Sequence, residues 1–361
     1  NTYLSYNMVV GNAMDSTLGV AFDVLDYALL SAPGAPLKQA LLDAGIGKEI
    51  YGDYSDGVLQ PFFSIVAKGA KTSQKEKFVS VIRNCLQDIV RNGIDKKAIL
   101  AGINYMEFRY READFGQFPK GLMYGLDIMG SWLYDDENAF SQVQLLSIYD
   151  RLKEAVNEGY FEKLIQKWLL DNTHGLILTL VPKRGLAAQR EKELADKLEA
   201  YRSSLSDGQL EEMVEKTKAL EAYQESEERP EDLQCIPMLK RSDIRKEVNG
   251  FSNEELQVDN SLFLYQDVCT NGIGYVNVMF EIKDMAVEKV HYLGLLKSVL
   301  GYVDTENYTY GQLFNETNAR TGGIQCGVDV FDKADDPEAF RAMFTIRGKA
   351  LYPQMDFLFQ M

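Results

Sequence analysis

Residues 186–224 read LAAQREKELADKLEAYRSSLSDGQLEEMVEKTKALEAYQ, and they decide how the chain is organised. An apolar stripe recurs at helical spacing in each half of this stretch. The stripes consist of Leu194, Leu198, Tyr201 and Leu205, and of Leu210, Met213, Thr217, Leu220 and Tyr223. Between them Ser206 and Gln209 match a capping box. Because so narrow a seam cannot make a globular core, we predict an antiparallel helical hairpin that bridges two larger bodies.

The composition is acidic and rich enough in apolar residues for several cores. A length of 361 residues allows two or three domains, and 46% of the residues are hydrophobic. The chain has 54 acidic and 38 basic residues, a net charge of −16. We therefore expect no nucleic-acid partner, while cationic partners would be attracted and an acidic surface would favour solubility. No apolar run approaches the roughly 18 residues of a membrane span, so no membrane contact is expected.

The residues before the hairpin predict an α+β unit in which strands and helices alternate. In chain order its predicted elements are a strand over 3–10, a helix with Leu18, Phe22, Leu25 and Leu29 on one face, a short helix over 37–44, a polar edge segment, a strand over 61–67, a helix over 74–92, two or three further helices as far as Trp168, and a strand over 176–181.

The residues after the hairpin predict the same order again. The elements are a strand over 275–282, a helix with Val287, Val290, Leu293, Leu296 and Leu300, a short helix from Tyr310, strands over 324–331 and 343–347, and the start of a helix over 352–361. The fold class is therefore α+β, with two homologous α/β-sandwich units, the second truncated, joined by the hairpin. The predicted domains are 1–183, 184–232 and 233–361, and the incomplete second copy indicates a fragment of a longer protein.

The two histidines do not form a metal site in sequence. His174 and His291 are 117 residues apart, and neither has a glutamate at the spacing of a zinc motif. We interpret His174 as a turn or capping residue before a strand, and His291 as a partly buried residue on a helix. No catalytic, cofactor-binding or metal-binding residue is predicted.

Other polar motifs have structural interpretations. The segment 45–49 superficially resembles a phosphate loop, but Glu49 replaces the required hydroxyl residue, so a helix C-cap and turn is favoured. The acidic clusters are interpreted as solvated turns or exposed helix positions. They comprise Asp135, Asp136 and Glu137; Asp335 and Asp336; and Glu211, Glu212 and Glu215.

The four cysteines are scattered along the chain and form no paired motif. They are Cys85, Cys235, Cys269 and Cys326. Such cysteines are usually buried thiols in a reducing compartment, so we expect all four to be reduced. The N-terminal residues do not resemble a signal peptide, and a targeting segment is either lacking or removed.

Segments along the whole chain, in order, resemble the pitrilysin/insulinase superfamily of inverted-zincin metallopeptidases and its presequence protease-like subfamily. They are SAPGAPL at 31–37, ALLDAGIG at 40–47, GLILTLVP at 175–182, LQCIPMLKRSDI at 233–244, GYVDT at 301–305 and RTGGI at 320–324. The match corresponds to the second domain, the hairpin linker and the start of the third domain of that subfamily.

The resemblance implies a parent enzyme of four homologous domains that close around a chamber for unfolded peptides. Its zinc would be held in the first domain by an H-x-x-E-H motif, whose inner glutamate acts as general base. This chain lacks that motif, so the resemblance implies no zinc and no catalytic residue here.

Two functions follow from the resemblance. The chain is expected to be a non-catalytic central segment of a zinc metallopeptidase, providing chamber wall and hinge. The alternative is a segment of a catalytically inactive homologue that acts as a scaffold or partner subunit. Unfolded peptides and the parent's N- and C-terminal domains are the expected partners, in the bacterial cytoplasm or an organelle matrix.

Overall fold

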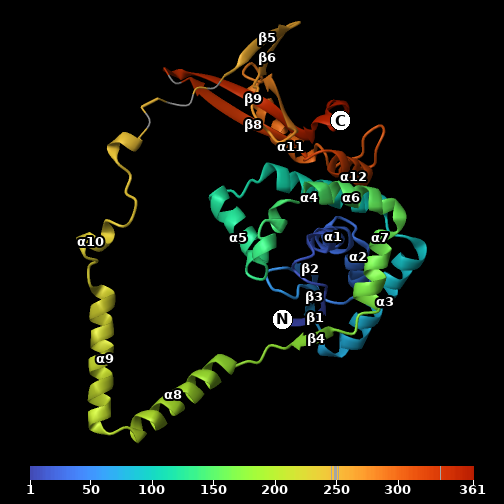
Figure 1. Cartoon of the computed structure of the whole chain (residues 1–361). Helices are drawn as coiled ribbons and strands as arrows, with labels where there is room; N and C mark the ends of the chain where they lie inside the picture. The colour runs from blue at the N-terminus through green and yellow to red at the C-terminus, as the bar shows by residue number, and fades with distance from the viewer. Residues whose placement is uncertain (245, 248–249, 251, 334) are drawn as a thin grey trace. The chain divides into compact units, whose positions relative to one another are not determined.

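The computed structural model describes residues 1–244, 246–247, 250, 252–333 and 335–361 (Figure 1). Contacts divide the chain into two compact units. The first consists of Asn1–Val181 together with Cys269–Met361, and the second is Pro182–Val268. Helices and strands are mixed throughout, which confirms the predicted α+β class. The predicted domains, 1–183, 184–232 and 233–361, are consecutive segments of the sequence, whereas these units are defined by contacts. The domain division stays a prediction.

A four-stranded antiparallel sheet organises residues 1–181. Its strands are β1 (Thr2–Val9), β2 (Glu49–Ser55), β3 (Phe62–Ala70) and β4 (Gly175–Leu180). Their spatial order is β2-β3-β1-β4, so the last strand of the segment pairs with the first. The polar edge segment expected from the sequence is the edge strand β2.

Two apolar helices cover one face of this sheet. They are α1 (Ser16–Asp26), which continues as a π-helical turn (Tyr27–Ser31), and α2 (Pro36–Asp43). The Asp15 carboxylate accepts a hydrogen bond from the Leu18 amide and begins α1. The side chains of Phe22, Leu25 and Leu29 are fully buried in the core, as their helical spacing predicts.

The stretch Ser16–Asp43 corrects the expectation that no segment of the sequence is long and apolar enough to span a membrane. By length and composition it could span a membrane, with a mean hydropathy of 1.2 in its most apolar window. More than half of that window, 56%, is buried inside the protein. Burial in the core therefore accounts for its apolar composition.

Further helices enclose the core around α1 and α2 (Figure 1). They are α3 (Lys75–Asn92), α4 (Lys96–Glu112), α5 (Lys120–Trp132), α6 (Leu146–Ala155) and α7 (Tyr160–Leu164) with a π-helical extension (Ile165–Leu170). After α3 this makes four helices, where the sequence predicted two or three. The difference arises because α6 and α7 are short, so each has too few turns for its helical periodicity to be recognised as a separate helix in the sequence.

Residues 269–361 form a second antiparallel sheet. Its strands are β7 (Ile273–Glu281), β8 (Ile324–Lys333) and β9 (Asp336–Leu351), and its helices are α11 (Val287–Val299), α12 (Tyr310–Arg320) and α13 (Met355–Gln360). The strand order β8-β9-β7 has the connectivity of β2-β3-β1 in the first sheet. Strand β9 (Asp336–Leu351) is longer than the predicted strand over 343–347, because its N-terminal half also pairs with β8 in an antiparallel hairpin.

Helix α4 joins the two sheets into one compact unit. The side chain of Asn104 donates hydrogen bonds to the carbonyls of Asn318 (2.9 Å) and Thr321 (3.2 Å) at the end of α12. Lys349 of β9 forms an ion pair with Glu112 at 2.6 Å. These contacts come from α4, so α4 serves both the core of residues 1–181 and the packing of the second sheet.

Residues 182–268 contain α8 (Leu186–Ser204), α9 (Asp207–Glu225), the short α10 (Pro230–Leu233) and a hairpin of β5 (Glu254–Val258) and β6 (Ser261–Tyr265). The two long helices and the capping box at Ser206 confirm that part of the sequence prediction. The stripe residues Leu194, Leu198 and Tyr223 are exposed, however, so the predicted antiparallel seam is not confirmed. The β5–β6 hairpin was not predicted.

The capping box supplies a testable prediction. Replacing Ser206 with alanine should destabilise the first turn of α9 by about 0.5–2 kcal/mol, because the Gln209 amide loses its side-chain acceptor. Hydrogen exchange at residues 208–211 of the whole chain measures the change. Ser204→Ala is the matched control, since the Ser204 hydroxyl donates to the Tyr201 carbonyl within its own helix and caps no amide. Equal effects of both substitutions would contradict the capping role.

Candidate functional site

The face of the four-stranded sheet opposite α1 and α2 carries an exposed apolar row. On edge strand β4 the side chains of Leu176, Leu178 and Leu180 are 62%, 50% and 59% exposed. Residues alternate between the two faces of a strand, so Ile177 between them contacts the core. The row therefore arises because leucine occupies every second position of GLILTL, at 176, 178 and 180, so that all three leucines lie on the same face of the strand.

Polar groups of β1 and β3 lie beside the leucine row. Asn7 is paired with Leu176 across the sheet, and its amide donates to the Leu176 carbonyl at 3.3 Å. The hydroxyls of Ser5 (2.9 Å) and Ser64 (2.7 Å) both donate to the Asn7 side-chain oxygen. These bonds fix the amide and leave an ordered polar strip next to the leucines.

The opposite edge of this face is charged. Lys68 on β3 forms an ion pair of 2.6 Å with Glu49 on β2, and both side chains are solvent-accessible. The pKa of Lys68 is raised by the hydrogen bond and the charge of Glu49. The face thus combines apolar, amide and ion-paired groups, and its named groups do not form a nucleophile–base pair.

The two histidines have separate, structural surroundings. His174 precedes β4, where its amide donates to Asn172 and its carbonyl accepts from Val9, as the turn interpretation predicts. His291 is exposed on α11 with its ring against Tyr292. The expectation of partial burial was wrong, because the neighbouring residues of α11 are themselves exposed.

Within the part of the chain that the structure describes, no group of three His, Cys, Asp or Glu side chains could hold a metal ion. The residues present therefore do not fit the zinc that the resemblance implies for the parent enzyme. Cys235 and Cys269 are exposed, so the expectation of buried thiols was wrong for these two, while Cys85 and Cys326 are half-buried. The reduced state of all four stays a prediction.

The interpretation of segment 45–49 as a C-cap and turn is confirmed. Helix α2 ends at Asp43, Gly45 and Gly47 both have positive φ, and the chain then enters β2. Among the acidic clusters, Asp135 caps a turn by accepting from the amide of Glu137 and the side chain of Asn138. Asp335 is exposed and lies in the turn between β8 and β9, as predicted, whereas the exposed Asp336 is the first residue of β9.

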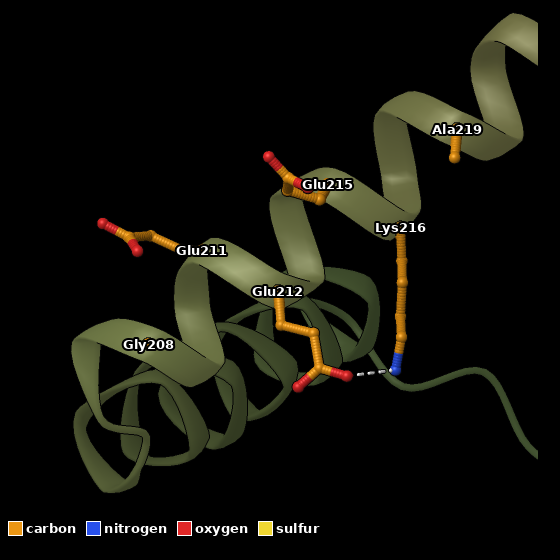
Figure 2. A pocket seen from close by; sticks show the side chains of 6 residues that line it. All are labelled: Gly208, Glu211, Glu212, Glu215, Lys216 and Ala219. Carbon is orange, nitrogen blue, oxygen red and sulfur yellow. Dashed lines mark ion pairs between the residues drawn. The ribbon is translucent and has the colours of Figure 1, made fainter.

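The acidic run on α9 is exposed, as predicted. Figure 2 shows Glu211, Glu212 and Glu215 on one helix, together with Lys216, which pairs with Glu212 at 2.7 Å. All six residues that line this shallow depression belong to α9. A surface contributed by one helix side does not enclose a ligand, so the solvated interpretation holds.

The sequence did not single out an acidic group at one end of α1. Asp23 and Asp26 lie three residues apart on α1, near Asp53 and Asp56 at the end of β2. Burial, together with the charges of Asp56 and Asp26, raises the pKa of Asp23 to about 7 against the opposing effect of Arg109. Burial also raises the pKa of Asp26, although the Ser31 hydroxyl donates to it at 2.9 Å. The sequence signal that could have revealed this group is the presence of two aspartates, Asp23 and Asp26, in an otherwise apolar helix.

This shift predicts a pH dependence of stability. Between the unfolded pKa of 3.8 and the folded pKa of about 7, the folded chain holds a proton on Asp23 that the unfolded chain releases. The free energy of unfolding should therefore fall as the pH rises through this window. Asp23→Asn should flatten the decline in denaturant titrations and stabilise the chain above the window. Exposed Asp43→Asn controls for the lost charge, and an unchanged slope in Asp23→Asn would contradict the assignment.

Comparison with known proteins places the chain in a family. The family model for the domain associated with peptidases of family M16, subfamily C, matches residues 180–361, half of the chain. The chain belongs to this family. The resemblance to presequence protease-like members of the pitrilysin superfamily is confirmed.

Curated relatives of this peptidase-associated chain match nearly all of it. Protein HypA of Clostridium perfringens is 39% identical over 350 residues, which cover 97% of the chain and 36% of HypA. Presequence protease 1, chloroplastic/mitochondrial, of Arabidopsis thaliana is 29% identical over 353 residues, which cover 96% of the chain and 32% of that protein. The chain thus spans about a third of the length of these relatives.

Solved structures superpose only loosely. Pitrilysin covers 99% of the chain with 35% of its own length, at a TM-score of 0.42 and 14% identity. A protease from Helicobacter pylori covers 50% of the chain with 41% of its own length, at a TM-score of 0.36 and 16% identity.

Proposed function

We propose that this chain is a non-catalytic central segment of a presequence protease-like zinc metallopeptidase, in which it supplies chamber wall and hinge. The observation that carries the proposal is the open sheet face, whose exposed Leu176, Leu178 and Leu180 lie beside the ordered amide of Asn7. Extended peptides are bound by surfaces of this kind, because backbone groups and alternate side chains both find partners. Family membership supplies the class of reaction.

Zinc and the catalytic base are proposed to lie in another domain of the parent. Zinc would supply the polarised water that attacks the peptide bond. We propose that the residues of this chain bind and enclose peptide. The parent's other domains and unfolded peptides are the proposed partners, in the bacterial cytoplasm or an organelle matrix.

The hairpin linker, residues 184–232, is proposed to act as the hinge. A closing chamber concentrates backbone rotation in a few residues at the ends of elements. Gly185, which begins α8, has a φ of +76°, and a Cβ built there would contact nothing within 4 Å. A side chain at this position would therefore act through its backbone preference rather than through a clash. We further propose that the stripes of α8 and α9 pair as an antiparallel hairpin in the parent.

The experiment replaces Gly185 with valine in the intact parent. Turnover of long peptides, which need wide opening, should fall by at least about fivefold, corresponding to roughly 1 kcal/mol of added backbone strain. Turnover of short peptides should change less. Gly301→Val is a matched control, since Gly301 also has a positive φ (+86°) and would place its Cβ in open space, but it lies outside the linker.

Equal effects on long and short peptides, or equal effects of Gly185→Val and Gly301→Val, would contradict the hinge. A parent that binds no zinc and cleaves no peptide would instead favour the inactive-homologue alternative.

A further inference from the structure

Helix α4 presents polar side chains to the segment that carries the second sheet. Lys97, Asn104 and Arg111 recur at i, i+7 and i+14, so they lie along one side of the helix. Ile99 and Ile103, in contrast, are fully buried in the core around the first sheet. Helix α4 therefore belongs to the first core by its apolar side and contacts the second segment through polar groups.

The contacts along this polar side extend from the first turn of α4 to its last. Lys97 forms an ion pair of 2.9 Å with Glu316 on α12. At the other end of the helix, Glu112 pairs with Lys349 of β9 and accepts a hydrogen bond from the Tyr275 hydroxyl at 3.0 Å. Polar contacts of this kind are typical of domain interfaces that separate and rejoin, because each group can exchange its partner for water.

Arg111 holds the turn that leads into β7. Its Nη1 donates to the Asn271 carbonyl at 3.1 Å, and the Asn271 side-chain amide donates back to the Arg111 carbonyl at 3.0 Å. Asn271 has a positive φ of 53°, which is uncommon for a residue other than glycine. We call this reciprocal pair the Arg111–Asn271 clamp. It fixes the chain where it returns from the segment Pro182–Val268.

Glu107 lies one helical turn before Arg111 and is only 1% exposed. Its Oε1 accepts a hydrogen bond from Nε of Arg111 at 2.7 Å, and its Oε2 lies 2.6 Å from Nζ of Lys153 on α6. Burial of a carboxylate costs free energy, which these two cationic partners offset. Because the guanidinium is planar and rigid, a bond at Nε also fixes the direction of Nη1. Glu107 thus determines where Arg111 points.

We propose that buried Glu107 is a positioning residue, which aims Arg111 at Asn271 and thereby controls whether the second sheet stays on α4. With the Glu107 carboxylate in place, the Arg111–Asn271 clamp forms and the other polar contacts of α4 close with it. Without this carboxylate Arg111 rotates freely, and the segment 269–361 leaves α4 as a folded body. The use of this release in opening the parent rests on the proposed hinge, whereas the clamp itself does not.

A zero-length carbodiimide cross-linker measures the contact in the whole chain, because it joins a lysine amine to a carboxylate only where the two are in direct contact. Mass spectrometry should find two interface products, Lys97–Glu316 and Lys349–Glu112. The Lys68–Glu49 pair, at 2.6 Å, lies within the first sheet and supplies an internal reference. The measured quantity is the ratio of each interface product to this reference.

Single substitutions test the two members of the relay. Glu107→Gln should lower both ratios at least about threefold, because a neutral amide accepts a weaker hydrogen bond than a carboxylate. Arg111→Lys should lower them as well, since one amine does not reproduce the fork that reaches both Glu107 and Asn271. Asp150→Asn is the matched control. Asp150 also pairs with Lys153, at 3.4 Å, but its side chain is 71% exposed, so its loss should leave the ratios unchanged.

A double-mutant cycle separates positioning from a general effect on stability. In the Arg111→Lys background, Glu107→Gln should cause little further loss, because the group through which Glu107 acts is already altered. Additive losses would overturn the proposal, as would unchanged ratios in either single variant or an equal loss in Asp150→Asn. If circular dichroism showed that Glu107→Gln does not fold, Arg111→Lys and Asn271→Gly would decide the matter, and unchanged ratios in both would overturn the clamp.

Failure of the proposed function would be seen separately. A parent whose turnover of long peptides responds equally to Gly185→Val and Gly301→Val would contradict the hinge. The cross-link ratios of the chain and their dependence on Glu107 would be unaffected by that result.

Discussion

Phe22→Ala is expected to lower the free energy of unfolding by about 3–5 kcal/mol, because it leaves a cavity where α1 meets the first sheet. Phe22 is fully buried and packs against Tyr54 and Phe63, with ring centroids 5.6 and 5.7 Å away. Those two rings belong to β2 and β3, so the lost contacts join the helix to both strands. Urea titration of the whole chain, followed by circular dichroism, measures the change.

Phe359→Ala is the control for this prediction. Phe359 has the same side chain but is 66% exposed near the end of the chain, so its loss should change the stability by less than about 0.5 kcal/mol. A destabilisation by Phe22→Ala no greater than this would mean that α1 does not pack on the first sheet as described.

Gly322→Ala is expected to destabilise the packing of the second sheet on α4 by about 1–3 kcal/mol, because the added methyl group overfills a close contact. A Cβ at Gly322 would lie 2.7 Å from the Phe108 ring and 2.8 Å from the Lys349 side chain. Phe108 is buried, and Lys349 is tied to Glu112, so neither group moves away freely. Hydrogen exchange should show faster exchange in α12 and β9, and urea titration should show the loss of stability.

Gly294→Ala is the matched control within the same segment. Gly294 lies on α11, and a Cβ there meets nothing within 4 Å. The substitution should be neutral or stabilising by up to about 1 kcal/mol, because alanine favours helix. If Gly322→Ala behaved in the same way, α4 and residues 269–361 would not be in close contact.

Sequence patterns predicted the elements well where one physical rule dominated. The stripe of Leu18, Phe22, Leu25 and Leu29 predicted α1 because a helix buried on one side repeats its apolar residues at that spacing. The capped turn at Ser206 was predicted because a side chain three residues from its partner is a local feature.

Features that depend on long-range contacts could not be predicted. Asn104 gives no signal in sequence that its amide binds carbonyls 214 and 217 residues away. The β5–β6 hairpin was missed because β6 (Ser261–Tyr265) has apolar residues on both faces and β5 (Glu254–Val258) shows only a short alternation, with Leu256 and Val258 on one face. The exposure of His291 was missed because the apolar stripe of α11 suggested a buried side.

The candidate sites divide in the same way. The leucine row on β4 could have been read from the alternation in GLILTL, although sequence alone does not say which side faces the core. The Arg111–Asn271 clamp could not, because its two residues are 160 positions apart in the chain. The acidic group at Asp23 needed the position of Asp56, which lies on another element.

The central claim is that this chain forms part of a peptidase without containing its catalytic centre. The direct test is the zinc content and peptidase activity of the purified 361-residue chain, measured beside the intact parent protein. We predict about one zinc and chelator-sensitive peptide cleavage for the parent, and neither for the chain. About one tightly held zinc per chain, with chelator-sensitive cleavage by the chain alone, would contradict the account.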